Sequence, residues 1–282
     1  MISLPPKVFF DTQVIIDAER GSIPSDDWSR VASYLRNTTR YCISPLTAGE
    51  LIYALANGDS RYFKQHQRRL RILLSPGENA EVFDFITYFF AAQFGLSISR
   101  PDHLEDDFLG TINLILEASS KDALLQGFRR SGENAHQTAR VRIDRFANEH
   151  FQTMQKYVEF MESRKQAGTL EALPREWASL LLKLYGVPEG DLDPLEIAER
   201  LSATYEFEMA VNNLMKSDKF SVTKNKSDHL DGQQLCYLCD PSVVFVTNDS
   251  DFKNRTKKSR QSSRIKSFSE IVALATAKSP LM

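Results

Sequence analysis

The 282-residue sequence predicts an α/β fold in which a parallel sheet is flanked by helices. Short apolar segments near both ends of the chain stop abruptly at polar residues, and each is followed by a segment with helical periodicity. Parallel strands need crossover connections, which such helices provide. The middle of the chain shows helical periodicity almost throughout. We therefore expect one α/β unit and a largely helical addition to it.

The first strand is expected at residues 7–10, because this apolar run ends at Asp11 and residues 12–18 can form a helix. A second strand is expected at residues 41–44, followed by a helix over residues 45–58. Both strands lead directly into a helix. This is the order typical of a parallel sheet.

Glu50 has two structural interpretations. Thr47 and Glu50 fit the capping-box pattern S/T-x-x-E, in which Glu50 would serve only the helix start. Pro45, however, suits the first helical position, which makes Ser44 the N-cap and places Glu50 more than one turn inside the helix. Reciprocal capping is then out of its reach.

The alternation of strands and helices returns near the C-terminus. We expect a helix over residues 228–238 and a buried strand at 243–247, broken by the polar residues up to Asp249. A last strand is expected at residues 265–268, before a helix over residues 269–277. Asp249, like Asp11, thus follows a strand.

The intervening segment carries three clear helical patterns. They cover residues 143–161, residues 174–185 before Gly186, and residues 194–209 with Asp193 as the N-cap. We accordingly assign residues 1–58 and 218–282 to the α/β core and residues 59–217 to a helical insertion that can share one core with it.

Composition excludes several classes of protein. With 42% hydrophobic and 26% charged residues, the chain falls in the globular range. Neither a signal peptide nor a membrane-spanning segment is indicated, so a cytoplasmic location without membrane contact is expected. Three cysteines are too few for a disulfide framework. Cys236 and Cys239 form a single C-x-x-C inside an apolar helix, which favours buried thiols over zinc.

Four acidic residues are placed where they can meet. In an open parallel sheet, ligands bind beyond the carboxyl ends of the strands, and Asp11 and Asp249 both follow strands. Glu50 and Asp231 lie on helices near such ends. Clustered carboxylates suit hard divalent cations such as Mg²⁺, and without a cation their mutual repulsion raises their pKa values. We therefore predict a metal site built from these four side chains.

Alternatives exist for each acid. Asp11 and Asp249 can be turn formers, since aspartate favours the loop after a strand. Asp228 and Asp231, three residues apart on a helix, project from nearly the same face, and either can instead favour the positive end of that helix. Asp228 and Asp251 are auxiliary candidates for the metal site.

The sequence resembles the PIN-domain nucleases. The resemblance covers the two ends of the chain and rests on four segments, which occur in the family's order: VFFDTQVIID at 8–17, ISPLTAGELIYAL at 43–55, SDHLDGQQLCYL at 227–238 and VFVTNDSDF at 244–252. It implies a parallel sheet between helices and an acidic site that holds Mg²⁺ or Mn²⁺ for cutting RNA. By the same resemblance, the metal ligands are Asp11, Glu50, Asp231 and Asp249, with Asp228 and Asp251 as auxiliaries.

Three further residues lie beside these positions. Thr12 adjoins Asp11, and Thr247 matches a place where the family often has a hydroxyl next to the metal site. Gln13 departs from the family pattern, because the family commonly has Asn at this position. The hydrogen bonds that orient Asp11 are therefore expected to differ from those in the family. The long helical middle is a second departure.

A run of cations from Lys253 to Lys266 contains no acidic residue. Lys253, Arg255 and Lys257 are candidates for holding substrate phosphates, as are three arginines at 140, 142 and 145. A solvated loop explains the run equally well.

The leading functional hypothesis is a metal-dependent endoribonuclease, with RNA as substrate and a protein antitoxin or a second copy of the chain as partner. The alternative from another class is a catalytically silent PIN-like module that binds RNA or protein. Toprim-like chemistry on DNA, suggested by the D-x-D of Asp249 and Asp251, leaves Asp11 unexplained. Haloacid-dehalogenase chemistry is disfavoured because Gln13 stands where a second Asp is needed.

Overall fold

Five parallel strands form one sheet in the computed structural model of the chain. The structure describes residues 5–77, 80–99, 104–126, 155, 158–159, 162–163, 174–187, 193–216, 221 and 228–281. The strands are β1 (Lys7–Phe10), β2 (Arg40–Ile43), β3 (Glu81–Val82), β4 (Val243–Val246) and β5 (Ile265–Lys266). They are ordered β3-β2-β1-β4-β5, and every pairing between neighbours is parallel. The predicted α/β class is confirmed.

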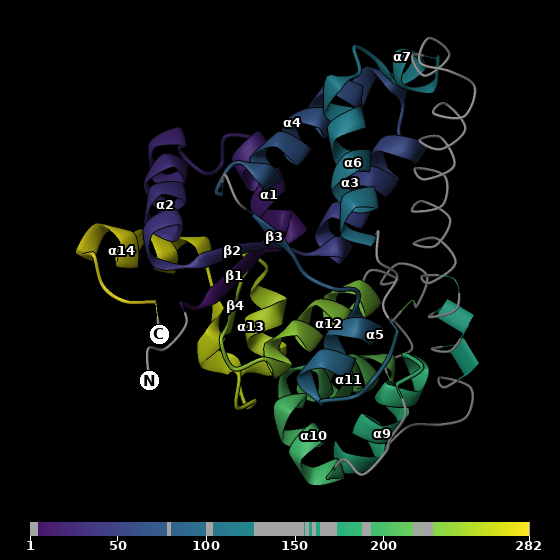
Figure 1. Cartoon of the computed structure of the whole chain (residues 1–282). Helices are drawn as coiled ribbons and strands as arrows, with labels where there is room; N and C mark the ends of the chain where they lie inside the picture. The colour runs from purple at the N-terminus through teal and green to yellow at the C-terminus, as the bar shows by residue number, and fades with distance from the viewer. Residues whose placement is uncertain are drawn as a thin grey trace.

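Helices cover both faces of this sheet (Figure 1). One face packs against α1 (Thr12–Glu19), α2 (Ser25–Thr38), α3 (Pro45–Asn57), α4 (Phe63–Leu74), α6 (Leu104–Glu117), α7 (Lys121–Gln126) and α14 (Phe268–Ala277). The other packs against α5 (Ile86–Gln93), α9 (Pro174–Leu184), α10 (Pro194–Arg200), α11 (Ser202–Met215), α12 (Asp228–Cys236) and α13 (Ser250–Thr256). Two hydrophobic cores result.

The alternation of side chains along the strands separates the two cores. On β1, Val8 and Phe10 point into the core with α1 to α4, and Phe9 points into the other. On β4, Val244 belongs to the first core and Phe245 to the second. All five side chains are at most 1% exposed, as expected for a sheet covered on both faces.

The described part of residues 59–217 contributes to both cores. α4 and α6 join the core of α1 to α3, and α5, α9, α10 and α11 join the opposite core. β3 also lies in this range and extends the sheet beyond β2. These residues therefore share their hydrophobic cores with the α/β elements at the two chain ends.

Most predicted elements near the chain ends are confirmed within a residue or two. Ser44 is the N-cap of α3 and its hydroxyl accepts a hydrogen bond from the backbone N of Leu46 at 3.2 Å, so Glu50 lies well inside that helix. The last strand and the helix of residues 228–238 are shorter than predicted. The helix predicted over residues 143–161 falls outside the described residues except for 155 and 158–159, which are helical.

The single helix predicted over residues 194–209 is wrong. α10 ends at Arg200, and α11 begins at Ser202 after a break at Leu201, whose backbone angles are φ −105° and ψ 15°. The hydrophobic periodicity continues across the break, which is why the sequence suggested one helix.

Gln261 explains this break. Its buried side chain donates hydrogen bonds to the carbonyl oxygens of Glu199 (2.8 Å) and Arg200 (3.1 Å) at the end of α10. The side-chain oxygen accepts from the backbone N of Ala203 (3.0 Å) and from the hydroxyl of Ser202. One amide thus satisfies the last two carbonyls of α10 and the backbone N–H of Ala203 at the start of α11.

We expect Gln261→Ala to lower the free energy of unfolding by about 2–3 kcal/mol, since several buried backbone groups would lose their partner. Urea denaturation measures this change. Ser263→Ala, an exposed site two residues away, is the control and is expected to have an effect within about 0.5 kcal/mol. Equal, small effects of both substitutions would contradict the role given to Gln261.

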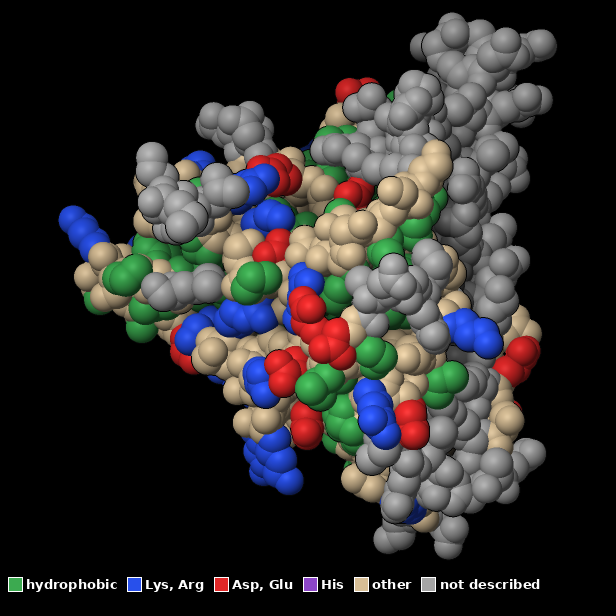
Figure 2. Space-filling model, turned by 60° about the horizontal axis from the view of Figure 1, so that its bottom comes forward, with side chains coloured by type: hydrophobic (Ala, Val, Ile, Leu, Met, Phe, Trp, Pro, Cys, Tyr) green, Lys and Arg blue, Asp and Glu red, His purple; other side chains and the backbone are tan. Residues whose placement is uncertain are grey.

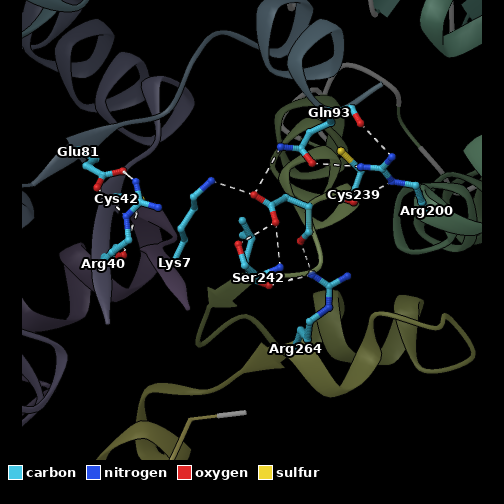
Figure 3. Close-up of polar contacts among 11 residues, drawn as sticks. Lys7, Arg40, Cys42, Glu81, Gln93, Arg200, Cys239, Ser242 and Arg264 are labelled. Atoms are coloured by element: carbon cyan, nitrogen blue, oxygen red, sulfur yellow. Dashed lines mark hydrogen bonds and ion pairs between the residues drawn. The ribbon is translucent and has the colours of Figure 1, made fainter. Parts of the chain in front are cut away.

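A polar network joins the amino ends of the strands to the helical part of the chain (Figure 3). Asp240 accepts hydrogen bonds from Lys7 at the start of β1 (2.9 Å), from Ser242 (2.7 and 2.8 Å) and from Gln93 at the end of α5 (3.5 Å). Arg200 donates to the carbonyl oxygen of Gln93 at 2.9 Å. The network lies at the opposite edge of the sheet from the predicted acids.

Arg264, just before β5, belongs to the same network. Its guanidinium donates to the carbonyl oxygens of Leu238 (2.6 Å), Asp240 (2.7 Å) and Val243 (2.9 Å). One side chain therefore fixes the turn that leads into β4.

Two further expectations concern buried groups and membranes. Cys42, Cys236 and Cys239 are free and buried, as predicted for the C-x-x-C pair. Within the described ranges, no helix is both long enough and apolar enough to cross a membrane.

Candidate functional site

Asp11 lies at the carboxyl edge of the two central strands. Its backbone N donates to the carbonyl oxygen of Val246 at 2.9 Å, which places it between the ends of β1 and β4. Asp11 occupies the N-cap position of α1, but its side chain caps no backbone N–H. Asp11 is 5% exposed, and its carboxylate is directed toward other side chains.

Two side chains hold the Asp11 carboxylate. The hydroxyl of Thr247 donates to Oδ2 at 2.8 Å, and the amide of Gln234 on α12 donates to Oδ1 at 3.4 Å. Burial, with a smaller effect from the charge of Asp249, raises the pKa of Asp11 to about 6 in spite of these hydrogen bonds. The buried Oε1 of Gln234 has no hydrogen-bond partner among the described residues.

Glu50 reaches the same edge from α3. Thr47, one turn earlier, donates to the carbonyl oxygen of Phe10 at 3.0 Å and so fixes α3 against the end of β1. The Thr12 hydroxyl donates to the Glu50 carboxylate. Burial and the charge of Asp11 raise the pKa of Glu50 to about 7. This carboxylate is thus electrostatically coupled to the first.

Asp231 completes the group from α12. Burial is the main reason that its pKa lies well above the usual value, and the charges of Asp11 and Glu50 are the next largest causes. The charges of Asp228 and Asp249 act in the same direction. Asp231 is therefore electrostatically coupled to each of the other three predicted acids.

Asp249 also has a structural role in the loop after β4. It is the N-cap of α13, and its Oδ1 accepts from the backbone N of Asp251 at 2.7 Å. Its own N donates to the Thr247 hydroxyl at 3.0 Å. Thr247 consequently contacts two of the four acids and sets their relative position.

The two auxiliary acids turn toward a cation. Arg255 on α13 lies 3.3 Å from Oδ2 of Asp228 and donates to Oδ2 of Asp251 at 2.9 Å. Asp228 therefore contacts Arg255. Asp231 lies three residues away on the same helix, and the negative charge of Asp228 contributes to its raised pKa. Arg255, predicted to hold phosphate, is thus engaged by carboxylates.

Gln13 is directed away from Asp11. Its amide donates to Oδ1 of Asp17 at 2.7 Å, and Asn248 donates to the other oxygen of Asp17 at 2.8 Å. Asn248 in turn accepts from the backbone N of Phe268. These contacts tie α1 to the loop between Thr247 and Asp249. Of the three residues predicted to hydrogen-bond the metal ligands, Thr12 donates to Glu50 and Thr247 donates to Asp11, whereas Gln13 contacts neither.

The other predicted phosphate contacts have mixed surroundings. Lys253 forms an ion pair with Glu270 on α14. Lys257 is exposed and lines a groove of about 500 Å³ between α11 and α13, with Glu206 and Asp251 among its other walls. On the face shown in Figure 2, Lys and Arg side chains are interleaved with Asp and Glu. The arginines at 140, 142 and 145 lie outside the described residues.

The pairing of Lys253 with Glu270 predicts an acid-dependent loss of stability. Partial burial raises the pKa of Glu270, but hydrogen bonds from Lys253 and Ser267 outweigh it and lower the pKa to about 2. This stabilisation is complete above the unfolded pKa and is lost as pH falls toward 2. Glu270→Gln should be less stable than the parent by up to about 1 kcal/mol at neutral pH, because the pair is partly exposed.

Thermal unfolding of both proteins between neutral pH and about pH 2 tests this prediction. The difference should shrink below about pH 4.5 and vanish near 2. Glu196→Gln, at an exposed i,i+4 pair, should leave the profile unchanged. A difference that persists at the acid end would contradict the assignment.

Gln234 was missed by the sequence analysis. It follows Asp231 by three residues, so both project from nearly the same face of α12. An amide on the same helix face as a candidate ligand acid is the signal that could have identified it.

The chemistry of the donors fits a hard divalent cation. Carboxylate oxygens are its preferred ligands, and a bound cation would offset both the burial that mainly raises these pKa values and the smaller repulsion between the acids. The unpartnered Oε1 of Gln234 is a further oxygen at this place. Among the described residues, no three His, Cys, Asp or Glu side chains are already arranged as a metal shell.

Fold and site together define a class: a parallel α/β protein with an acid cluster at the carboxyl edge of its central strands. Comparison with protein-family models, with curated proteins and with solved structures finds no match to this chain.

Proposed function

We propose that this protein is a divalent-metal-dependent endoribonuclease of the PIN type. The observation that carries the proposal is the coupled cluster of Asp11, Glu50, Asp231 and Asp249, whose members come from four separate elements and whose first three have raised pKa values. Burying ionised carboxylates close together destabilises a fold unless a bound cation compensates their charge.

Asp11, Glu50, Asp231 and Asp249 would hold Mg²⁺ or Mn²⁺. When bound, the metal supplies an activated water and stabilises negative charge on the phosphodiester oxygens. Thr247 orients Asp11 through Oδ2, and Thr12 orients Glu50. Because these hydroxyls fix the carboxylates, they act as positioning residues.

The proposed function also implies a substrate, a partner and a location in the cell. RNA is the substrate, and a protein antitoxin or a second copy of the chain is the partner. A cytoplasmic location is supported by three free, buried cysteines.

A second candidate is a catalytically silent PIN-like module that binds RNA or protein. The observation that favours it is the structural use of several acids: Asp249 caps α13, and Asp228 and Asp251 contact Arg255. In such a module the acids would stabilise the loop after β4.

Two measurements separate the candidates. Single-stranded RNA should be cleaved in Mn²⁺ or Mg²⁺ and not in EDTA, and calorimetric titration should detect Mn²⁺ binding that the double variant Glu50→Gln/Asp231→Asn loses. The matched control replaces two exposed acids, Asp26→Asn and Glu196→Gln, and should bind as the parent does. RNA binding without Mn²⁺ binding or cleavage in the parent would favour the silent module.

A further inference from the structure

The solvent face of α4 is basic along its whole length. The exposed residues of this helix and of the turn before it (Ser60–Tyr62) are Ser60, Arg61, Tyr62, Lys64, Arg68 and Arg71. The cations recur at spacings of three and four residues, so they form one line on the helix surface. At 1.5 Å per residue this line is about 15 Å long.

Few carboxylates compensate this charge. Arg61 pairs with Asp59 at 2.9 Å, and Glu19 on α1 serves both Arg68 (3.2 Å) and the buried Arg69 (3.3 Å).

Among the described residues, the other two cations contact backbone carbonyls and no carboxylate. Lys64 donates to Ala118 at 3.5 Å, and Arg71 donates to Leu116 at 3.1 Å. The five cations on and beside α4, set against two contacting carboxylates, leave an excess of three positive charges.

This arrangement is unfavourable for the isolated helix. Lys64 and Arg68 are a like-charged i,i+4 pair, which costs about 0.2–0.5 kcal/mol. Lys64 also lies in the first turn, where the helix dipole disfavours a cation. The opposite face of α4 supplies Phe63, Leu70 and Leu73 to the core, so packing holds the helix in place in spite of the repulsion. A partner that brings negative charge would relieve it.

The shape of the surface favours a nucleic-acid strand. Its cations form a line that can follow a phosphate backbone, and Tyr62, 49% exposed, offers a ring on which a base can stack. The guanidinium of Arg61 lies 5.6 Å from the centre of that ring. A membrane surface would call for apolar side chains beside the cations, but those of α4 are buried in the core.

We propose that the α4 surface, formed by Arg61, Tyr62, Lys64, Arg68 and Arg71, binds the phosphate backbone of single-stranded RNA and stacks a base on Tyr62. The choice of RNA rests on the proposed ribonuclease function. α4 packs against both α1 and α3, which carry Thr12 and Glu50. The α4 surface would therefore hold a strand on the same side of the sheet as two helices of the acid cluster.

The test is fluorescence anisotropy with a labelled oligouridylate of about twelve nucleotides. Binding is measured in EDTA, in the Asp11→Asn background, so that cleavage plays no part. The triple variant Arg61→Gln/Lys64→Gln/Arg71→Gln spares Arg68, because that residue pairs with Glu19. We expect Kd to rise on the order of tenfold and the slope of log K against log salt to become shallower by about 2.

Three exposed cations elsewhere provide the matched control. Arg36→Gln/Arg175→Gln/Lys216→Gln makes the same change in net charge and should leave Kd within about twofold of the parent. Tyr62→Ala should weaken binding at least fivefold, whereas Tyr62→Phe should bind as the parent does. An abasic strand should not distinguish the two Tyr62 variants. Thermal unfolding confirms that each variant is folded.

Unchanged RNA affinity of the α4 triple variant, or an equal loss of RNA affinity in the dispersed control, would overturn the proposal. Displacement of the RNA by polyglutamate at equal charge concentration would also overturn it. So would phosphatidylserine vesicles that bind the parent but not the triple variant while RNA binding is unchanged. Failure of the nuclease proposal has a different signature, namely RNA binding that depends on α4 in a protein that cleaves nothing with Mn²⁺.

Discussion

Asp11→Asn is expected to reduce RNA cleavage in Mn²⁺ on the order of a thousandfold. Removing a side chain that only orients a metal ligand costs about 10–100-fold, and loss of a ligand should exceed that. Asn keeps the shape of Asp, so Thr247 can still donate to its side-chain oxygen. The loss would therefore report on the negative charge itself.

The same substitution should stabilise the metal-free protein. A pKa of about 6 in place of 3.8 corresponds to about 3 kcal/mol of cost when Asp11 is ionised in the fold. Gln234 now donates to Asp11 through Nε2, and a turn of its amide by 180° would let its unpartnered Oε1 accept from the Asn amide instead. We expect the variant to gain about 1–3 kcal/mol at pH 7.5 in EDTA.

The pH dependence of this gain follows from the direction of the shift. Because the folded pKa of Asp11 is raised, protonation stabilises the parent below about 3.8, and this contribution is lost as pH rises through about 6. The advantage of Asp11→Asn should thus be small at pH 4 and should develop between pH 4 and 7. Saturating Mn²⁺ should stabilise the parent selectively.

Chemical denaturation in EDTA and in Mn²⁺, combined with cleavage rates, measures both effects. Asp17→Asn is the control on the same helix. Asp17 accepts one hydrogen bond from Gln13 and one from Asn248, and Asn keeps only one of the two acceptor oxygens, so this variant should lose stability and gain none. An Asp11→Asn protein that cleaves RNA as the parent does would eliminate Asp11 from the proposed mechanism.

The sheet and its acids were predictable because their signals are local. The apolar runs of β1 and β4 stop at a polar residue, and Pro45 fixes the start of α3 and hence the depth of Glu50. Parallel topology then brings Asp11 and Asp249 to one edge. These inferences need only neighbouring residues and one rule of topology.

The features that were missed depend on partners far away in the sequence. The break at Leu201 is made by Gln261, which no pattern around residue 201 reveals. The two residues of β3 are too few to show a period. The run of cations that begins at Lys253 contains no acidic residue. In the fold, Lys253 pairs with Glu270 and Arg255 pairs with Asp228, both far away in the sequence.

Arg264→Ala should cause the largest loss of stability, about 3–5 kcal/mol. Three carbonyl acceptors, those of Leu238, Asp240 and Val243, would lose the donor that they share. Each buried acceptor without a partner costs about 1–3 kcal/mol, and water can replace part of this because Arg264 is only partly buried.

Arg260 offers a control of the same residue type four positions earlier. It is largely exposed and pairs with Glu199 at 2.7 Å, so Arg260→Ala should cost less than about 1 kcal/mol. Arg264→Lys should fall between the two, since an ammonium cannot reproduce the planar donor fork. Urea denaturation ranks the three variants. Equal losses for Arg260→Ala and Arg264→Ala would show that the carbonyl contacts contribute little.

The contacts of Arg264 stabilise the fold at a place distant from the proposed metal site. Arg264 precedes β5, and its carbonyl acceptors lie just before β4 or at its first residue, at the amino edge of the sheet, whereas Asp11 follows β1 at the carboxyl edge. Arg264→Ala should lower the fraction of folded protein yet leave Mn²⁺ affinity and the cleavage rate per folded molecule unchanged. Asp11→Asn should do the reverse, losing cleavage while the metal-free fold becomes more stable. Opposite outcomes at the two edges would place the proposed activity at the carboxyl edge.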